Sequence, residues 1–283
     1  MQNYEYLIIG SNGLLGSNIV KILKKKKLSY LTVARKKSNY NLDLKNFRKL
    51  KNFFKKSTFK IVINCAGIID INYCEKHFNK ALIINSFFVK FLSEMSRRFK
   101  FKLIQISTDH IYRGKKSKLN SEKSKIFAIN NYAKTKIISE RYLVGLKKYL
   151  IIRTNFTGKK KNTFIDWLIK SLKKKKTIYL FDDMYTSTID VKSCAKIIID
   201  LSSINSKGIY NIGTRDYLSK KEFAIKIFKK LKKNIKFRSI SCDIQKTPRG
   251  KNLGLNVKKI ENKIGYKMPT SEKAATNLVQ EYQ

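Results

Sequence analysis

Three glycines follow an apolar segment near the start of the chain, and this arrangement restricts the possible fold more than any other feature. The apolar segment is 6–9, and Gly10, Gly13 and Gly16 follow it at the start of an amphipathic stretch over 14–25. Glycine permits a tight turn, then a close approach of the backbone to a bound group, then close packing of a helix on a strand. The spacing predicts a phosphate-binding turn at the start of a helix. The alternative is that these glycines only close a turn between a strand and a helix.

The first half of the chain continues this strand–helix alternation. Short apolar segments predict strands, and the segments between them carry apolar residues three and four positions apart, which predicts helices. Strands joined by helices in this way predict an α/β fold with a doubly wound parallel sheet of the Rossmann type. The predicted strands are 6–9, 30–33, 61–64, 103–107 and 149–152, and the predicted helices are 14–25, 44–54, 74–98 and 131–146.

The second half has a less regular pattern, which predicts a smaller lobe. We expect a dinucleotide-binding domain over 1–155 and a mainly substrate-binding lobe over 156–283, with segments near 186–212 returning to the main sheet. The predicted helices of the second half are 162–173, 191–201 and 220–232, and its predicted strands are 178–181 and 209–212.

The net charge of +44 has two interpretations. A basic chain attracts phosphate backbones, so nucleic-acid binding is one of them. The other is a compositional bias, because 53 of the 63 basic residues are lysine and clusters such as 24–27 fall at predicted helix ends, where they complement the helix dipole. No strip of alternating aromatic and basic residues is present, so the second interpretation is favoured and nucleic acid is not an expected partner.

The remaining composition points to a protein of the cytoplasm. The four cysteines are scattered and only two histidines are present, which suits reduced thiols and predicts no metal site. No secretory segment and no apolar run near ~18 residues is found, so we expect neither export nor a membrane span.

Several residues are placed where a bound dinucleotide would lie. Arg35 ends the second predicted strand, where an acidic residue would bind the adenosine ribose, and a guanidinium there favours NADPH over NADH. NADH stays open, because a basic residue can be incidental in so lysine-rich a chain. Asp43 and Leu44 either cover the adenine edge or mark a helix N-cap. Ala66 and Gly67 follow the third strand, where small residues let a cofactor pass close to the backbone.

A second group of residues can carry out proton chemistry. Tyr132 and Lys136 lie one turn apart on a predicted helix, so the ammonium group can sit beside the phenol. A nearby cation favours phenolate and lowers a tyrosine pKa from ~10 toward the working pH, which suits a general acid. Thr108, after the neighbouring strand, can donate a hydrogen bond to the same carbonyl oxygen. The alternative is that Tyr132 and Lys136 are two ordinary helix residues.

Taken in order, these motifs resemble the extended short-chain dehydrogenase/reductases, and more narrowly their dTDP-4-dehydrorhamnose reductase branch. The segment 106–114 (ISTDHIYRG) is similar to the branch's S-T-D-Y-V-F-x-G. Likewise 153–156 (RTNF) is similar to R-T-S-W, 208–211 (GIYN) to G-x-Y-H, and 247–256 (TPRGKNLGLN) to a late R-P-x-N-S-x-L-D segment. The resemblance covers almost the whole chain.

The resemblance implies a role for each matching residue. It implies Tyr132 as proton donor and Lys136 as its electrostatic partner and ribose ligand. Thr108, Asp109 and Phe156 are implied at the sugar of a nucleotide-linked 4-keto-6-deoxy substrate, most simply dTDP-4-dehydrorhamnose, which the enzyme would reduce to dTDP-L-rhamnose. The residues implied along the cofactor, in addition to Gly10 and Gly16 of the glycine turn, are Gly13, Leu14, Leu15, Asp43, Leu44, Ala66, Gly67 and Ile68.

Departures from the family pattern keep alternatives open. Phe156 replaces a tryptophan, and Asn18 replaces a carboxylate that some members use in a metal-linked dimer, so both a monomer and a homodimer are possible. Sugar-nucleotide epimerases and dehydratases share the superfamily, but dehydratases place an Asp-Glu pair after the threonine, and here His110 follows Asp109. A non-catalytic NADP-binding regulatory subunit is the other alternative, and it need not retain Tyr132 and Lys136.

Overall fold

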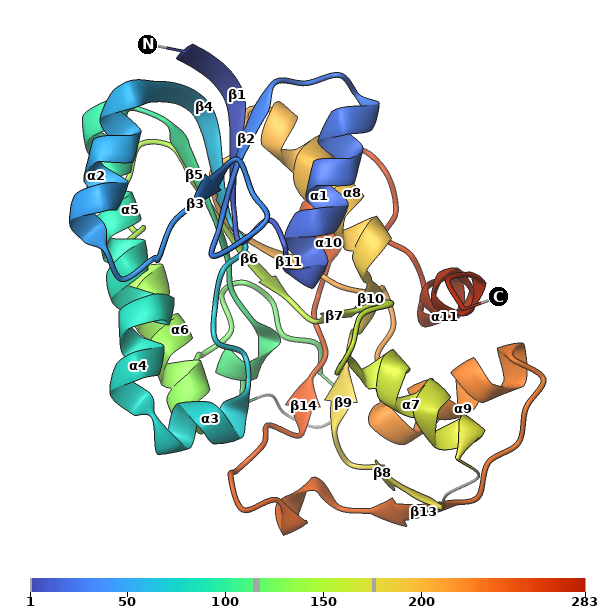
Figure 1. Cartoon of the computed structure of the whole chain (residues 1–283). Helices are drawn as coiled ribbons and strands as arrows, with labels where there is room; N and C mark the ends of the chain where they lie inside the picture. Colours follow the sequence, from blue (N-terminus) through green and yellow to red (C-terminus); the bar gives the residue numbers. More distant parts are fainter. Residues whose placement is uncertain (1, 114–117, 175–176, 283) are drawn as a thin grey trace. The chain divides into compact units, whose positions relative to one another are not determined.

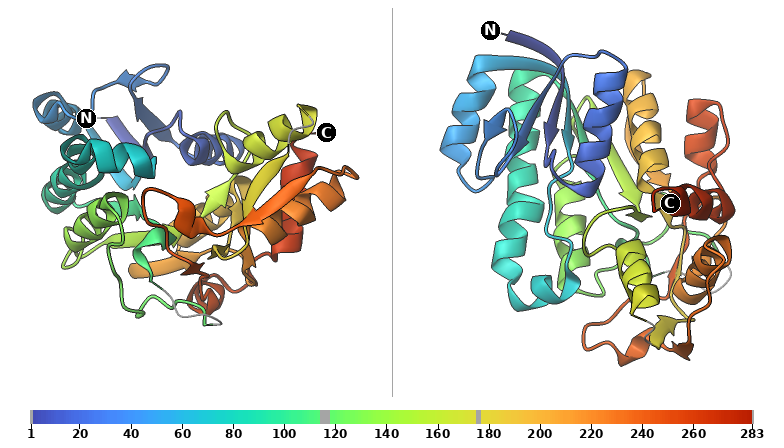
Figure 2. Two further views of the ribbon diagram at one scale, coloured as in Figure 1. Left: turned by 90° about the horizontal axis from the view of Figure 1, so that it is seen from below. Right: turned by 45° about the vertical axis from the view of Figure 1, so that its right-hand side comes forward.

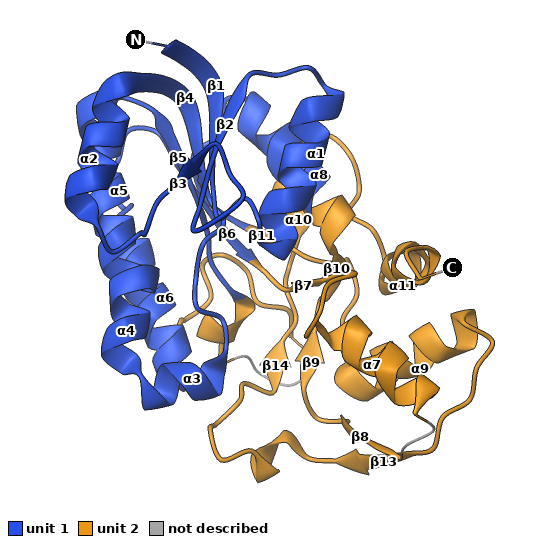
Figure 3. Cartoon of the chain, in the orientation of Figure 1, with its two compact units in different colours: residues 1–108, 130–153, 195–210 blue, residues 109–129, 154–194, 211–283 orange. Residues whose placement is uncertain are grey.

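The computed structural model describes residues 2–113, 118–174 and 177–282 and divides into two compact units (Figure 3). One junction between the units lies between Arg153 and Thr154, and the domain boundary expected at residue 155 stays a prediction. Segment 109–129, expected in the first domain, groups with the second unit. Gly114 of the family-like segment lies outside the described residues. The first unit contains Met1–Thr108, Asn130–Arg153 and Ala195–Tyr210, and the second contains Asp109–Ile129, Thr154–Cys194 and Asn211–Gln283.

A seven-stranded sheet forms the centre of the first unit, and the predicted fold class is confirmed. The strand order β3-β2-β1-β4-β5-β6-β11 is that of a doubly wound nucleotide-binding sheet. Ile9 pairs with both Val33 and Asn64, so the carboxyl ends of three parallel strands reach the same edge. In order along the chain the strands are β1 (Gln2–Ile9), β2 (Tyr30–Ala34), β3 (Tyr40–Asn41), β4 (Ser57–Asn64), β5 (Lys102–Ile106), β6 (Tyr149–Thr154) and β11 (Gly208–Ile212).

Helices cover both faces of this sheet (Figures 1 and 2). Helices α2, α5 and α6 lie on one face, and α1 and α8 lie on the other. The apolar side of each helix packs on strands that are buried on both faces, as expected for a parallel sheet. The helices are α1 (Leu14–Lys25), α2 (Phe47–Lys56), α3 (Ile71–Lys76), α4 (Phe78–Leu82), the π-helical turn η1 (Ile83–Phe87), α5 (Phe88–Phe99), α6 (Asn131–Arg141) and α8 (Val191–Ser203).

The prediction of one continuous helix over 74–98 is wrong. His77 has φ −131° and ψ 51°, which breaks the helix between α3 and α4. The π-helical turn η1 then precedes α5. The apolar periodicity continues through these breaks, so the pattern alone could not show them. Inserted π-helical turns are frequent at functional sites.

Side-chain caps account for two of the other boundary differences. Asn46 accepts a hydrogen bond from the Lys49 N–H, so α2 begins at Phe47 rather than at 44. Thr163 caps α7 in the same way. The helix predicted over 131–146 ends at Arg141, and Gly145 adopts a left-handed conformation with φ +96°.

Short sheets and helices make up the second unit, around an apolar core of its own. Ile165, Leu180, Phe223 and Leu278 belong to this core. None of the helices in the described ranges has the length and apolarity that a bilayer span requires. The elements are η2 (Asp109–Ile111), β7 (Phe156–Thr157), α7 (Phe164–Lys173), β8 (Ile178–Phe181), β9 (Tyr185–Thr186), β10 (Ile189–Asp190), β12 (Leu218–Ser219), α9 (Lys220–Lys230), β13 (Phe237–Ile240), η3 (Cys242–Ile244), β14 (Asn252–Leu253), α10 (Lys258–Ile264) and α11 (Ser271–Gln280).

Candidate active site

The glycine turn brings two backbone segments of the first unit unusually close together. Gly10 has φ +77°, and a Cβ placed on it would lie 2.7 Å from the Ala66 backbone nitrogen. A Cβ on Gly16 would overlap the carbonyl oxygen of Gly10. Both positions therefore exclude a side chain, because the turn after β1 packs directly against the turn after β4.

The start of α1 offers unused hydrogen-bond donors beside a groove. Within the described residues no side chain caps α1, so its first N–H groups lack the partner that Asn130 supplies to α6. The buried Ser11 hydroxyl likewise has no hydrogen-bond partner in the described part of the chain. Ser11 lines a groove of about 750 Å³ together with Lys37, Ser38 and other residues of α1 and β2. These features fit the phosphate groups of a dinucleotide.

The structure places the other predicted adenosine-side residues as follows. Arg35 is exposed directly after β2 and does not line the groove described above. Asp43 is exposed and accepts a hydrogen bond from the Lys45 N–H, whereas Asn46 caps α2, so the N-cap interpretation of Asp43 is wrong. Leu44 is buried in the core of the first unit.

Two predicted catalytic residues of α6, Tyr132 and Lys136 (the α6 pair), lie against the turn after β4 and the end of β5. Lys136 is 4% exposed, and its Nζ donates a hydrogen bond of 3.0 Å to the Ile106 carbonyl oxygen. A Cβ on Gly67 would lie 3.4 Å from the same Nζ. Tyr132 packs in an apolar cluster with Cys74 and Ile68. The structure therefore brings Tyr132, Lys136 and the predicted 66–68 segment together.

Burial gives the Lys136 ammonium an unusual protonation equilibrium. Loss of hydration lowers its pKa to about 8, although the Glu140 carboxylate acts in the opposite direction. Burial also raises the pKa of the neighbouring Cys74 thiol to about 11, so that group stays neutral near pH 7. Thr108 is 4% exposed and follows β5 by two residues.

Asn85 is a site residue that the sequence did not reveal. From the π-helical turn η1, its side chain accepts from the Ile68 N–H at 2.8 Å and donates to the Ile68 carbonyl oxygen at 2.9 Å. It also donates to the Thr135 hydroxyl at 3.1 Å. Asn85 thus fixes the 66–68 segment to α6 beside Lys136. An asparagine inside an amphipathic helix pattern was the available signal.

Glu140 is a second residue that sequence analysis missed. It lies one turn after Lys136 on α6 and is 4% exposed. Its carboxylate accepts hydrogen bonds from Arg153 and from Ser107. The four-residue spacing 132, 136, 140 was visible in the sequence, but charged residues recur at this spacing on many exposed helix faces.

In the second unit, a buried polar chain surrounds Asp109. Asn155 donates to the Asp109 carboxylate at 2.9 Å and accepts from Thr188, to which Lys220 donates at 3.3 Å. Burial lowers the pKa of both Lys220 and His110, and Asp109 opposes the shift in each. Phe156, predicted at the sugar, is half-buried in β7.

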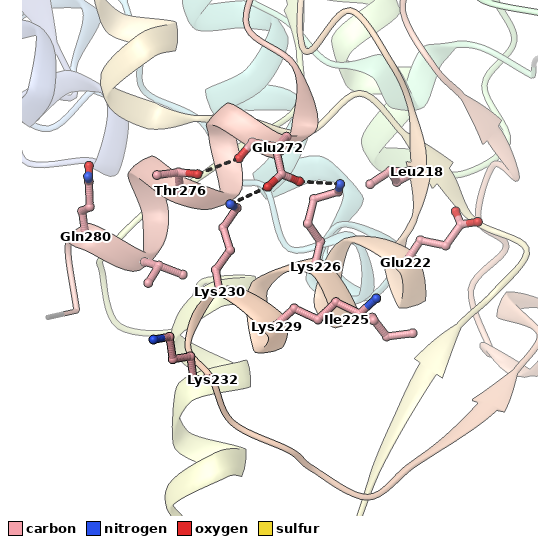
Figure 4. A pocket seen from close by; sticks show the side chains of 11 residues that line it. Leu218, Glu222, Ile225, Lys226, Lys229, Lys230, Lys232, Glu272, Thr276 and Gln280 are labelled. Carbon is pink, nitrogen blue, oxygen red and sulfur yellow. Dashed lines mark hydrogen bonds and ion pairs between the residues drawn. The ribbon is translucent and has the colours of Figure 1, made fainter.

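A larger groove, of about 840 Å³, lies in the second unit and contains none of the predicted site residues (Figure 4). Four lysines of the α9 region line it. Glu272 is paired with Lys226 and Lys230, and Glu222 caps α9. Both carboxylates of the groove therefore already have partners in the chain.

One group of described residues has the composition of a metal site. It comprises Asp183, Cys242 and Asp243. The Lys251 ammonium bonds to both carboxylates, so a cation of the chain already lies against them.

The parallel sheet with its glycine turn is the dinucleotide-binding fold of the extended short-chain dehydrogenases/reductases. The chain belongs to the RmlD substrate binding domain family, which matches residues 4–283.

Named relatives of similar length support the same placement. The spore coat polysaccharide biosynthesis protein SpsK of Bacillus subtilis is 26% identical over 249 residues, which cover 87% of this chain and 86% of that protein. A dTDP-4-dehydrorhamnose reductase of Aggregatibacter actinomycetemcomitans is 26% identical over 230 residues, covering 78% and 77%. The crystal structure of dTDP-4-dehydrorhamnose reductase from Bacillus anthracis in complex with NADP superimposes with a TM-score of 0.90 at 24% identity, covering 99% of each chain.

Proposed function

We propose that the protein uses NADPH to reduce the C4 keto group of a nucleotide-linked 4-keto-6-deoxy sugar, most simply dTDP-4-dehydrorhamnose. The observation that carries this proposal is the placement of Tyr132 and Lys136, buried on α6 beside the 66–68 segment and the end of β5. The sugar-nucleotide reductases among the relatives support the substrate class.

The chain's own groups have distinct tasks in this reduction. NADPH supplies the hydride when bound. Tyr132 donates its phenolic proton to the carbonyl oxygen as the carbonyl carbon becomes an alcohol, and the Lys136 ammonium stabilises the phenolate that remains. Thr108 donates a hydrogen bond to the developing oxyanion. The uncapped start of α1 and Ser11 are the groups we assign to the cofactor phosphates. On this proposal Asp109 and Phe156 contact the sugar.

The fold alone does not separate a reductase from a dehydratase or an epimerase, so the residues of the site have to distinguish them. His110 occupies the position after Asp109, and burial lowers its pKa, so it is neutral at pH 7. An imidazole is not a carboxyl group, so His110 does not supply the second one that the dehydratase pattern requires.

The test is incubation with NADPH and enzymatically prepared dTDP-4-dehydrorhamnose. We expect NADPH consumption in step with formation of a dTDP-deoxyhexose, measured by absorbance and by chromatography. Tyr132→Phe is the matched control and should show neither. Conversion of an unmodified sugar nucleotide without net NADPH consumption would instead assign the protein to the epimerases or dehydratases.

A further inference from the structure

The buried carboxylate of Glu140 has no task in the reduction described above. Glu140 lies four residues after Lys136, which lies four residues after Tyr132, so all three side chains leave the same face of α6. A buried charge is costly unless it is paired. The position of this carboxylate in the first unit therefore requires an explanation.

Glu140 is held from two other elements. Arg153, in β6, donates from Nη2 at 2.6 Å and from Nε at 3.1 Å, and its side chain is 3% exposed. Ser107, after β5, donates its hydroxyl at 2.5 Å. The carboxylate is therefore fixed in one orientation by the ends of two neighbouring parallel strands.

Lys136 also contacts the end of β5. Its Nζ bonds to the carbonyl oxygen of Ile106, and Glu140 bonds to Ser107, the next residue along the chain. Thr108 follows directly. The ammonium and the carboxylate therefore lie one helical turn apart on α6 and contact consecutive residues at the end of β5.

We propose that Glu140 is a positioning residue, whose anchored carboxylate keeps the Lys136 ammonium protonated and ties α6 to the strand end that carries Thr108. This inference rests on the proposed reduction, because that reduction gives Lys136 its catalytic task. Ser107 and Arg153 act through Glu140 by holding its carboxylate in place.

The charges around Lys136 support this role. Besides Glu140 on its own helix, the groups that act on its pKa are the Cys74 thiol of α3 and the Cys65 thiol after β4. The Cys74 thiol is neutral near pH 7, because burial raises its pKa to about 11. Glu140 is the first among the groups that oppose the effect of burial on Lys136. Its removal would also leave the Arg153 cation without this partner.

The experiment compares Glu140→Gln with the wild type over a pH series. In the wild type, kcat/KM and NADPH affinity should both fall above a pH of about 8, where Lys136 loses its proton. In Glu140→Gln, we expect this falling limb to move by about one pH unit to lower pH, because removal of the opposite charge that raises the Lys136 pKa lowers that pKa. Glu140→Asp retains the charge and should restore the position of the limb.

Two further variants separate this role from a loss of stability. Glu261→Gln is the matched control, since Glu261 is a buried carboxylate of the second unit that pairs with Arg215 and Lys267. It should lower the melting temperature and leave the limb in place. The double variant Glu140→Met with Arg153→Met removes both charges together, so we expect it to fold. The falling limb of its pH profile should be shifted as in Glu140→Gln. This variant therefore tests the role of Glu140 if Glu140→Gln is unstable.

The outcomes for the two proposals are distinguishable. A folded Glu140 variant whose limb coincides with that of the wild type, in both turnover and NADPH binding, overturns the role of Glu140 and leaves the reductase activity standing. A wild type that reduces no nucleotide-linked keto sugar overturns the proposed function. The pH dependence of NADPH affinity would still report on Glu140 in that case.

Discussion

At the residue scale, the two members of the α6 pair place different demands on a substitution. Tyr132→Phe retains the ring in its apolar cluster and removes only the proton donor. We expect turnover to fall by about 10²–10⁴-fold, the usual contribution of a general acid, while NADPH affinity and the melting temperature change little. Lys136→Ala should lower both turnover and NADPH affinity. Near wild-type turnover in Tyr132→Phe would contradict the proposed mechanism.

Thr108 provides a graded comparison for the same series. Thr108→Val deletes one hydrogen bond to the developing oxyanion, and we expect a smaller loss than in Tyr132→Phe or Lys136→Ala, at most about 10²–10³-fold in kcat. Steady-state turnover and calorimetric NADPH titration of the three variants measure this order. A loss in Thr108→Val as large as that in Lys136→Ala would assign Thr108 a different role.

We expect single residues of the groove beside Ser11 to decide the choice between NADPH and NADH. Lys37 lines the groove beside Ser11 and has a left-handed backbone with φ 53°. Lys37→Asn removes the ammonium but suits this backbone. We infer that this ammonium, beside Ser11 in the groove, binds the 2′-phosphate, and we expect the variant to weaken NADPH binding by about 1.5–3 kcal/mol and to leave NADH binding unchanged. Calorimetric titration measures both affinities.

Arg35 is the comparison for this prediction, since sequence reasoning placed the phosphate contact there. We expect NADPH to bind more tightly than NADH in the wild type, and Arg35→Asp to reduce that preference through repulsion of the 2′-phosphate. If Arg35→Asp removes the preference and Lys37→Asn does not, the guanidinium is the decisive group.

At the element scale, the turn after β1 tolerates no side chain. Gly10→Ala would place a Cβ 2.7 Å from the Ala66 nitrogen at φ +77°. We expect a loss of stability larger than the roughly 1–2 kcal/mol of left-handed strain, together with loss of NADPH binding. Gly145→Ala is the matched control, because Gly145 also has a positive φ, of +96°, but nothing lies within 4 Å of its Cβ position. Urea denaturation gives the free energy of unfolding of both variants and so separates backbone strain from atomic overlap. Equal losses of stability in the two variants would contradict the close approach of the Gly10 and Ala66 backbones.

The elements also show how far the sequence alone could lead. The helix predicted over 14–25 and the strand over 178–181 match α1 and β8, because an apolar period and clear end signals coincide there. The breaks at His77 and η1 could not be predicted, since the apolar pattern continues through them.

In the candidate site, the sequence alone could not show which polar side chains are buried and which residues they contact. Tyr132 and Lys136 could be proposed from their spacing and neighbouring motifs. Asn85 and Glu140 could not, because their importance comes from contacts with residues 17 and 33 positions away in sequence.

At the scale of the whole molecule, the dominant property is charge. A net charge of +44 on one chain makes the folded state repel itself, and the 19 acidic residues cannot neutralise 63 basic ones. We therefore expect the melting temperature to rise as ionic strength increases from roughly 0.02 M to 0.5 M, because salt screens this repulsion. Differential scanning calorimetry measures it. A melting temperature that falls with salt would show that attractive ion pairs dominate instead.

The path of the chain has a consequence for how the protein is made. The backbone passes five times between the two units, and Thr108 and Asp109, although adjacent, belong to different ones. Neither unit can be released intact by a single cut or expressed as one uninterrupted fragment. On the ribosome, the first unit lacks its last segment until Tyr210 has been synthesised, and by then most of the second unit's early segments have also emerged. Both units are therefore incomplete on the nascent chain at the same time. A premature stop near the midpoint of the coding sequence would yield neither of them.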